Sequence, residues 1–140
     1  MAAELLDLMQ AMARITEQET ELLYEHAPRA EIEEVVRDKI RLAAALDAQL
    51  ARMERENPEW RAEIDPELRV ELAEAAERMA NSAKANGIAL ERKIAFAEDL
   101  ILAIEQDTRR RRGSTSASYG AGGMMQRADL PSPIAINTQL

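Results

Sequence analysis

The side chains that most often carry out catalysis are scarce in this chain of 140 residues. Cysteine is absent and His26 is the only histidine, so the sequence offers neither a thiol nucleophile nor a cluster of thiolate and imidazole metal ligands. No glycine-rich phosphate loop is present. The carboxylates fall mainly at helical spacings such as Glu33/Arg37 and Glu74/Arg78, which are typical of solvated ion pairs. We therefore expect a protein that is not an enzyme and that needs no metal and no cofactor.

A few polar and aromatic side chains could instead contact partners. The four arginines at 109–112 suit the carbonyl end of a helix, although they could also dock on an acidic protein surface, a nucleic acid or a membrane. His26 is interpreted as a helix C-terminal cap or a surface residue. Trp60 is interpreted as a cap on the end of a bundle rather than as a ligand-stacking residue. Tyr119 could be either an anchor for a partner or an incidental residue of a tail.

Composition favours long helices over a round core. Aromatic residues make up 3% of the chain and charged residues 31%, while the apolar residues are mostly Ala, Leu, Ile and Met, which are good helix formers. The net charge is −8, and the positive part lies in residues 109–140, so the acidic body should repel nucleic acid. No apolar run reaches the ~20 residues of a membrane span, and the acidic start lacks the basic region of a secretory signal. These features predict a cytoplasmic protein.

Two prolines divide the chain into three long helices. Pro28 ends a first amphipathic helix at about 2–27 and begins a second at about 29–56. Asp65-Pro66 is an N-cap followed by proline at the first helical position, and the third helix is expected over about 66–112, where Gly113 ends it. The prediction is an all-α, antiparallel three-helix coiled-coil-like bundle with an overlong third helix. Residues 1–112 form the bundle, and residues 113–140 form a flexible C-terminal tail.

The other two helices are expected to pack along the third. Its stripe is predicted from small or apolar residues at 3- and 4-residue steps: Leu68, Leu72, Ala75, Met79, Ala83, Asn86/Gly87, Leu90, Ile94, Ala97, Ile101 and Ile104. Asn86-Gly87 is interpreted as a close helix–helix approach or a mild kink, with a hinge as the alternative. The helix would be roughly 70 Å long, against ~42 Å for the second helix. Its residues beyond about 94 should therefore project past the others.

The projecting part is not polar, which predicts a partner. That partner could be a helix of another protein, a second copy of the chain, or the chain's own tail. We expect the binding residues to be the apolar positions of the projecting stripe: Leu90, Ile94, Ala97, Leu100, Ile101 and Ile104.

Three stretches resemble the FlgN-type flagellar export chaperones. The second helix contains Lys39, Leu42, Leu46 and Asp47 in the pattern K-x-x-L-x-x-x-L-D. The third contains Asn86-Gly87-x-x-Leu90-Glu91-x-x-Ile94, and the tail contains Tyr119-Gly120-Ala121-x-Gly123 before a short apolar stretch at 134–136. The order and spacing match across most of the chain. The four arginines and the Pro131/Pro133 segment depart from the family pattern.

The resemblance implies a chaperone of type III flagellar export. Such proteins bind the C-terminal helices of hook-associated (hook–filament junction) proteins through their own C-terminal half, prevent premature assembly, and deliver the substrate to the export gate. Tyr119, with Gly120 and Gly123, would dock on the cytoplasmic domain of that gate. A monomer or weak dimer is expected. One alternative is a structural coiled-coil subunit that self-associates through the stripe, and another is a regulator whose basic segment contacts nucleic acid or membrane.

Overall fold

The computed structural model of the chain describes residues 1–118, of which residues 114–118 are described by their backbone. The described residues form α1 (Ala2–Tyr24), α2 (Arg29–Glu56), the single-turn α3 (Trp60–Glu63) and α4 (Pro66–Ser118). The predicted all-α fold with a long last helix is confirmed. The chain divides into two compact units, Met1–Phe96 and Ala97–Leu140, so α4 contributes to both.

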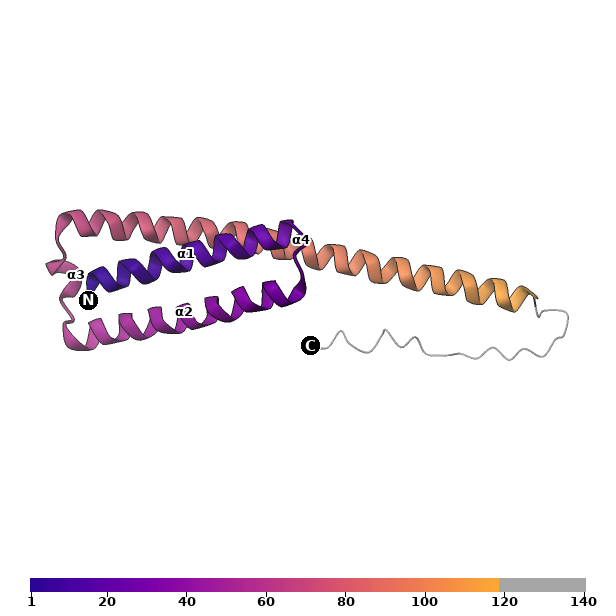
Figure 1. Ribbon diagram of the computed structural model, residues 1–140, viewed down its shortest axis with the longest axis horizontal. Helices are drawn as coiled ribbons and strands as arrows, with labels where there is room; N and C mark the ends of the chain where they lie inside the picture. The colour runs from indigo at the N-terminus through magenta and orange to yellow at the C-terminus, as the bar shows by residue number, and fades with distance from the viewer. Residues whose placement is uncertain (119–140) are drawn as a thin grey trace. The chain divides into compact units, whose positions relative to one another are not determined.

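The first unit is an antiparallel bundle of three long helices. Figure 1 shows α1, α2 and the first part of α4 running side by side within this unit. Side-chain bonds give the directions. Gln49 of α2 bonds Glu4 near the start of α1, and Lys39 bonds Glu19 near its end. Along α4, Arg78 bonds Glu17 of α1, while Asn86 bonds Thr20 further along. Therefore α1 is antiparallel to α2 and parallel to α4.

The core is narrow and made of small and medium side chains, as the low aromatic content predicts. On α4 the buried positions Ala75, Ser82 and Ala89 follow at seven-residue steps, which is the spacing of coiled-coil packing. The predicted stripe followed a longer period and was wrong at two places. Ser82 rather than Ala83, and Ala89 rather than Leu90, lies in the core.

The connection between α1 and α2 is longer than predicted. The first helix ends at Tyr24 rather than near residue 27. His26 has a positive φ of 55°, its N–H bonds the carbonyl of Leu23, and the Ala27 N–H bonds the carbonyl of Leu22. This pattern is a Schellman motif with His26 at the left-handed position that glycine usually occupies. The interpretation of His26 as part of a helix cap is confirmed.

The start of α4 follows the prediction, but its end does not. The Asp65 carboxylate accepts a hydrogen bond of 3.0 Å from the Glu67 N–H, so Asp65 is the N-cap before Pro66. The helix passes through Gly113 to Ser118. A glycine weakens a helix interior by about 1 kcal/mol, which is not enough to end it here because the sequence has no proline before Pro131.

Gly87 also lies inside α4. A Cβ added at Gly87 would meet no atom within 4 Å. The predicted close helix–helix approach at Gly87 is therefore wrong, because nothing there requires the small side chain.

Candidate functional site

An exposed apolar surface covers the part of α4 that follows the core positions. Every residue from 91 to 104 is exposed, although six of them are large apolar side chains. Isolated exposed apolar residues are common on proteins, whereas a continuous group of them marks a binding surface. The exposed large apolar side chains of this segment are Ile94, Phe96, Leu100, Ile101, Leu102 and Ile104.

All six residues that the sequence singled out for binding are exposed. The five large side chains among them have exposed fractions from 37% at Leu90 to 58% at Ile94, and Ala97 is exposed as well. Leu90 and Ile94 belong to the first unit, and the other four residues belong to the second. Leu90 follows the buried Ala89 at the edge of the core of the bundle. It therefore has the smallest exposed fraction of the five large side chains.

Charged side chains border this surface at its C-terminal end. Asp107 and Arg111 form an i, i+4 ion pair with 3.0 Å between Oδ2 and Nε. The side chains of Arg109, Arg110 and Arg112 are exposed. The end of the apolar surface is therefore cationic in a chain whose net charge is −8.

The structure leaves the predicted gate-docking residues untested. Tyr119, Gly120 and Gly123 fall outside the described residues, so the structure does not test their assignment.

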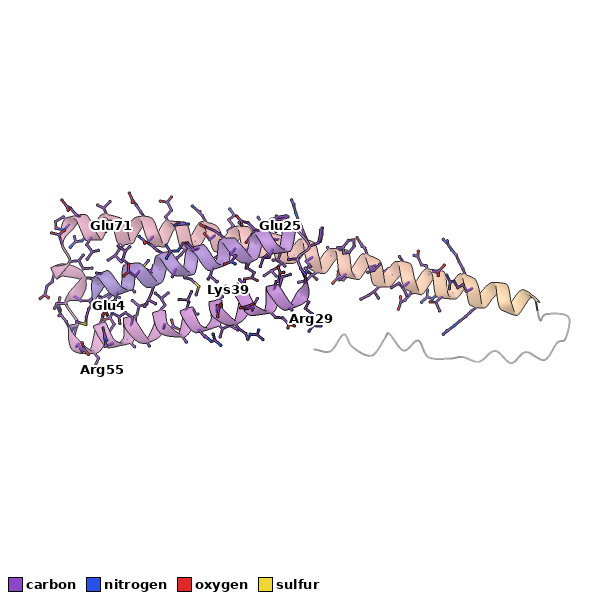
Figure 2. All side chains as sticks on the ribbon, in the orientation of Figure 1. Glu4, Glu25, Arg29, Lys39, Arg55 and Glu71 are labelled. Atoms are coloured by element: carbon purple, nitrogen blue, oxygen red, sulfur yellow. The ribbon has the colours of Figure 1, made fainter. Side chains whose placement is uncertain are left out.

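A buried polar cluster joins the three helices of the first unit. The Lys39 ammonium, on α2 in Figure 2, bonds the Glu19 carboxylate of α1 at 2.5 Å and the Asn86 Oδ1 of α4 at 3.3 Å. The Asn86 amide in turn donates to the Thr20 hydroxyl at 3.2 Å. Glu19 is only 2% exposed, so Lys39 and not water is the partner of its carboxylate. Such a cluster specifies which helix faces meet, because other registers would bury a charge without a partner.

A second polar contact lies at the edge of α1 and α4. Arg78 donates two hydrogen bonds to the Glu17 carboxylate, at 2.9 and 2.7 Å, and the Ser82 hydroxyl donates a third at 3.0 Å. The hydrogen bond from Arg78 is the main reason why the pKa of Glu17 lies below its ordinary value. The same contact raises the pKa of Arg78. The sequence predicted an i, i+4 pair between Glu74 and Arg78, but the arginine reaches across to α1 instead.

An apolar cavity of about 600 Å³ opens at the α3 end of the bundle. Leu5, Leu50, Trp60 and Leu72 are among the residues that line it, so every helix of the first unit contributes. The Trp60 indole N–H donates to Glu54 at 3.2 Å, which is the largest cause of the lowered pKa of that carboxyl. The position of Trp60 at this end agrees with its interpretation as a cap of the bundle.

A smaller hollow of about 310 Å³ lies near the α1–α2 turn. Leu23, Ala89 and Phe96 supply apolar contacts, and the Arg92 guanidinium lies 5.8 Å from the centre of the Tyr24 ring. This hollow borders the start of the exposed surface of α4.

The sequence carried a signal for the buried cluster that was not interpreted. Glu19 interrupts the apolar positions of the first helix, Lys39 falls among those of the second, and Asn86 is itself one of the predicted stripe positions of the third. Opposite charges that interrupt the stripes of neighbouring helices indicate a buried pair. Lys39 and Asn86 are also residues on which the family resemblance rests, and their contacts explain them as core residues of the bundle.

Within residues 1–118, no three His, Cys, Asp or Glu side chains gather closely enough to hold a metal ion. No helix among these residues combines the length and the apolar character that crossing a membrane requires.

Comparison with known proteins adds no family to these observations. The sequence matches no protein-family model, and no curated protein or solved structure matches it either.

Proposed function

We propose that this chain is a non-catalytic export chaperone that captures an amphipathic helix of another protein on the exposed apolar face of α4. Its substrates would be the C-terminal helices of hook-associated proteins, which it would hold in the cytoplasm and deliver to the type III flagellar export gate. The family resemblance of Lys39, Asn86-Gly87 and the Tyr119 segment supports the choice of substrate. The exposed face supports the mode of binding.

The observation that carries the proposal is the exposure of Leu100, Ile101 and Ile104, each about half exposed. Burying one such side chain completely contributes about 1.5–3 kcal/mol, so covering the exposed half contributes about 1 kcal/mol each. An amphipathic helix laid along α4 would cover several of these positions together, as in helix-in-groove recognition. The same binding would hide the apolar face of the substrate and so prevent it from polymerising.

The chemistry of the surface agrees with a binding role. The face is apolar, with charges at its borders, and its side chains act by being covered rather than by moving protons. Tyr119, Gly120 and Gly123 are proposed to dock on the cytoplasmic domain of the export gate after the substrate is bound. Capture and delivery would then use different segments of the chain.

The test is size-exclusion chromatography with light scattering. The full chain is run alone and with the C-terminal helical segment of a candidate hook-associated protein. We expect a stoichiometric complex, which Leu100→Asp and Ile101→Asp each abolish without loss of helicity by circular dichroism. The matched control is Leu102→Asp. Leu102 is an exposed leucine of the same segment, but it lies about 100° beyond Ile101, outside the row formed by the six predicted binding residues.

Other outcomes would contradict the proposal. Equal loss of binding in Leu102→Asp and Ile101→Asp would mean that no particular face of α4 binds the substrate. A tight homodimer that ignores the segment would favour a structural coiled-coil subunit that self-associates.

A further inference from the structure

The second unit carries a coiled-coil seam on its described helix. Ala97, Ile101, Ile104 and Thr108 follow at steps of four, three and four residues, which places them on one side of the helix. Ala97, Ile101 and Ile104 are exposed. A helix with this pattern can accept one partner helix along its seam.

One flank of this seam has an ordered set of charges. Glu98, Glu105 and Arg112 are spaced by seven residues, so they lie in a row beside the seam and read acid, acid, base towards the C-terminus. Glu98 and Arg112 are exposed, and Glu105 is partly exposed. None of the ion pairs between described residues includes any of these three side chains. They are available to a partner.

The row of charges also indicates the direction of the partner. A complementary row must place an acid beside Arg112 and bases beside Glu105 and Glu98. In an antiparallel partner the acid comes first and the bases follow. This order suits a helix, because anions are stabilising near its N-terminus and cations near its C-terminus. A parallel partner would need the opposite order, which its own dipole opposes.

A second copy of the chain provides only part of this complement. In an antiparallel coiled coil, residues on the same flank face each other across the seam. If two copies were centred on Ile101 and Leu102, Glu98 of one copy would face Glu105 of the other. Two such acid–acid contacts would form in a symmetric pair, although Arg112 would face Glu91, which continues the same row one heptad before Glu98. If the pair were centred on Glu105 instead, Glu98 would face Arg112 twice and Glu105 would face its own copy. Neither register matches all three charges of the row, whereas a different helix can match them all.

We propose that the helix bound by the second unit is antiparallel to α4 and carries an acid near its start, with a base one heptad later and another base two heptads later. This inference rests on the proposed function and specifies the chemistry of its substrate. The apolar side chains supply most of the affinity, and the row of charges selects the direction and the partner. A helix with the same apolar face and the wrong order of charges would bind less tightly.

The test uses two synthetic peptides of identical composition and net charge. Each has about 18 residues, enough to cover the ~22 Å from Ala97 to Arg112, and both share one Leu/Ile seam. Along the flank, the acid-first peptide reads Glu, Lys, Lys and the acid-last peptide reads Lys, Lys, Glu. Fluorescence anisotropy with the full chain measures both dissociation constants. We expect the acid-first peptide to bind about fivefold more tightly.

A charge-swapped chain removes the effect of peptide helicity. Glu98→Arg combined with Arg112→Glu keeps the net charge and reverses the row, so the acid-last peptide should now bind about fivefold more tightly. The matched control combines Asp99→Arg with Arg110→Glu, which makes the same exchange on the opposite side of the helix. This control should leave the preference of the wild-type chain unchanged.

Each contrary result overturns the inference in a recognisable way. Equal binding of both peptides to both chains would mean that charge order does not select the partner, while capture of the hook-associated segment could still stand. Preference of the wild-type chain for the acid-last peptide would mean a parallel partner. A stable dimer by light scattering that excludes both peptides would show that a second copy occupies the seam. Failure of both peptides while the hook-associated segment binds would mean that another feature of the substrate is recognised.

Discussion

Removing the Lys39 ammonium is the sharpest test of what holds the bundle in register. In the variant Lys39→Met, the methylene stem of the side chain is largely retained, but the charge and its hydrogen bonds to Glu19 and Asn86 are lost. The Glu19 side chain is 3% exposed and that of Lys39 is 26% exposed. The carboxylate is therefore left without its cation in a site that water reaches poorly.

The magnitude follows from this burial. Removing one partner of a buried ion pair costs about 3–5 kcal/mol, because the remaining charge is desolvated without compensation. Lys39 is itself partly exposed, so some water can replace it, and we expect a loss of about 3 kcal/mol from the free energy of unfolding. That loss is a large part of the 5–15 kcal/mol typical of a whole domain.

Urea unfolding followed by circular dichroism measures the loss. Arg41→Met is the control, because Arg41 pairs with Asp38 on the same helix while its side chain is 77% exposed. That variant should lose about 0–1 kcal/mol. The double variant Glu19→Leu/Lys39→Met should recover most of the stability, since no charge then remains buried. The reasoning is refuted if Lys39→Met costs no more than Arg41→Met, or if the double variant is as unstable as the single one.

A second prediction concerns how stability depends on pH, and it follows from the contact of Glu17 with Arg78. Because the hydrogen bond from Arg78 holds the pKa of Glu17 below its ordinary value of 4.5, the stability from this contact is present above 4.5 and is lost as the pH falls through the lowered pKa. In Arg78→Met, urea unfolding at a series of acidic pH values should show a weaker dependence on pH, and an unchanged dependence would contradict this account. At Gly87, alanine should raise the free energy of unfolding by about 0.5–1 kcal/mol, because the helix gains a better former. The added Cβ would meet no neighbour within 4 Å, so a clear loss of stability in urea unfolding would mean that the glycine has a conformational role.

The helix boundaries show where local rules suffice. Asp65 and Pro66 predicted the first residue of α4, because capping and the fixed φ of proline act within one turn. Gly113 was a weaker guide, because a glycine permits a helix end without requiring one. The end of α1 at Tyr24 depended on a non-glycine residue, His26, adopting a left-handed conformation. Sequence alone gives little reason to expect that.

Part of the candidate site was likewise predictable from local rules and part was not. Exposure of Leu100, Ile101 and Ile104 followed from comparing helix lengths, which needs only the rise per residue. Leu90 was placed on the predicted stripe of the third helix, but its neighbour Ala89 takes the core position and Leu90 is exposed. A shift of one residue turns a side chain by about 100°, so a small error in the assumed period exchanges core and surface.

By itself, the sequence determined the helical class, the order and approximate length of the three long helices, and an apolar stripe longer than its neighbours could cover. These features depend on propensity, on proline and on periodicity, all of which act locally along the chain. Only the tertiary structure decided which side chains meet: Lys39 with Glu19 and Asn86, and Arg78 with Glu17 rather than Glu74. Such contacts depend on the register and rotation of one helix against another. Register is set by the sum of all packing and polar contacts in the bundle, and no single stretch of sequence contains that sum.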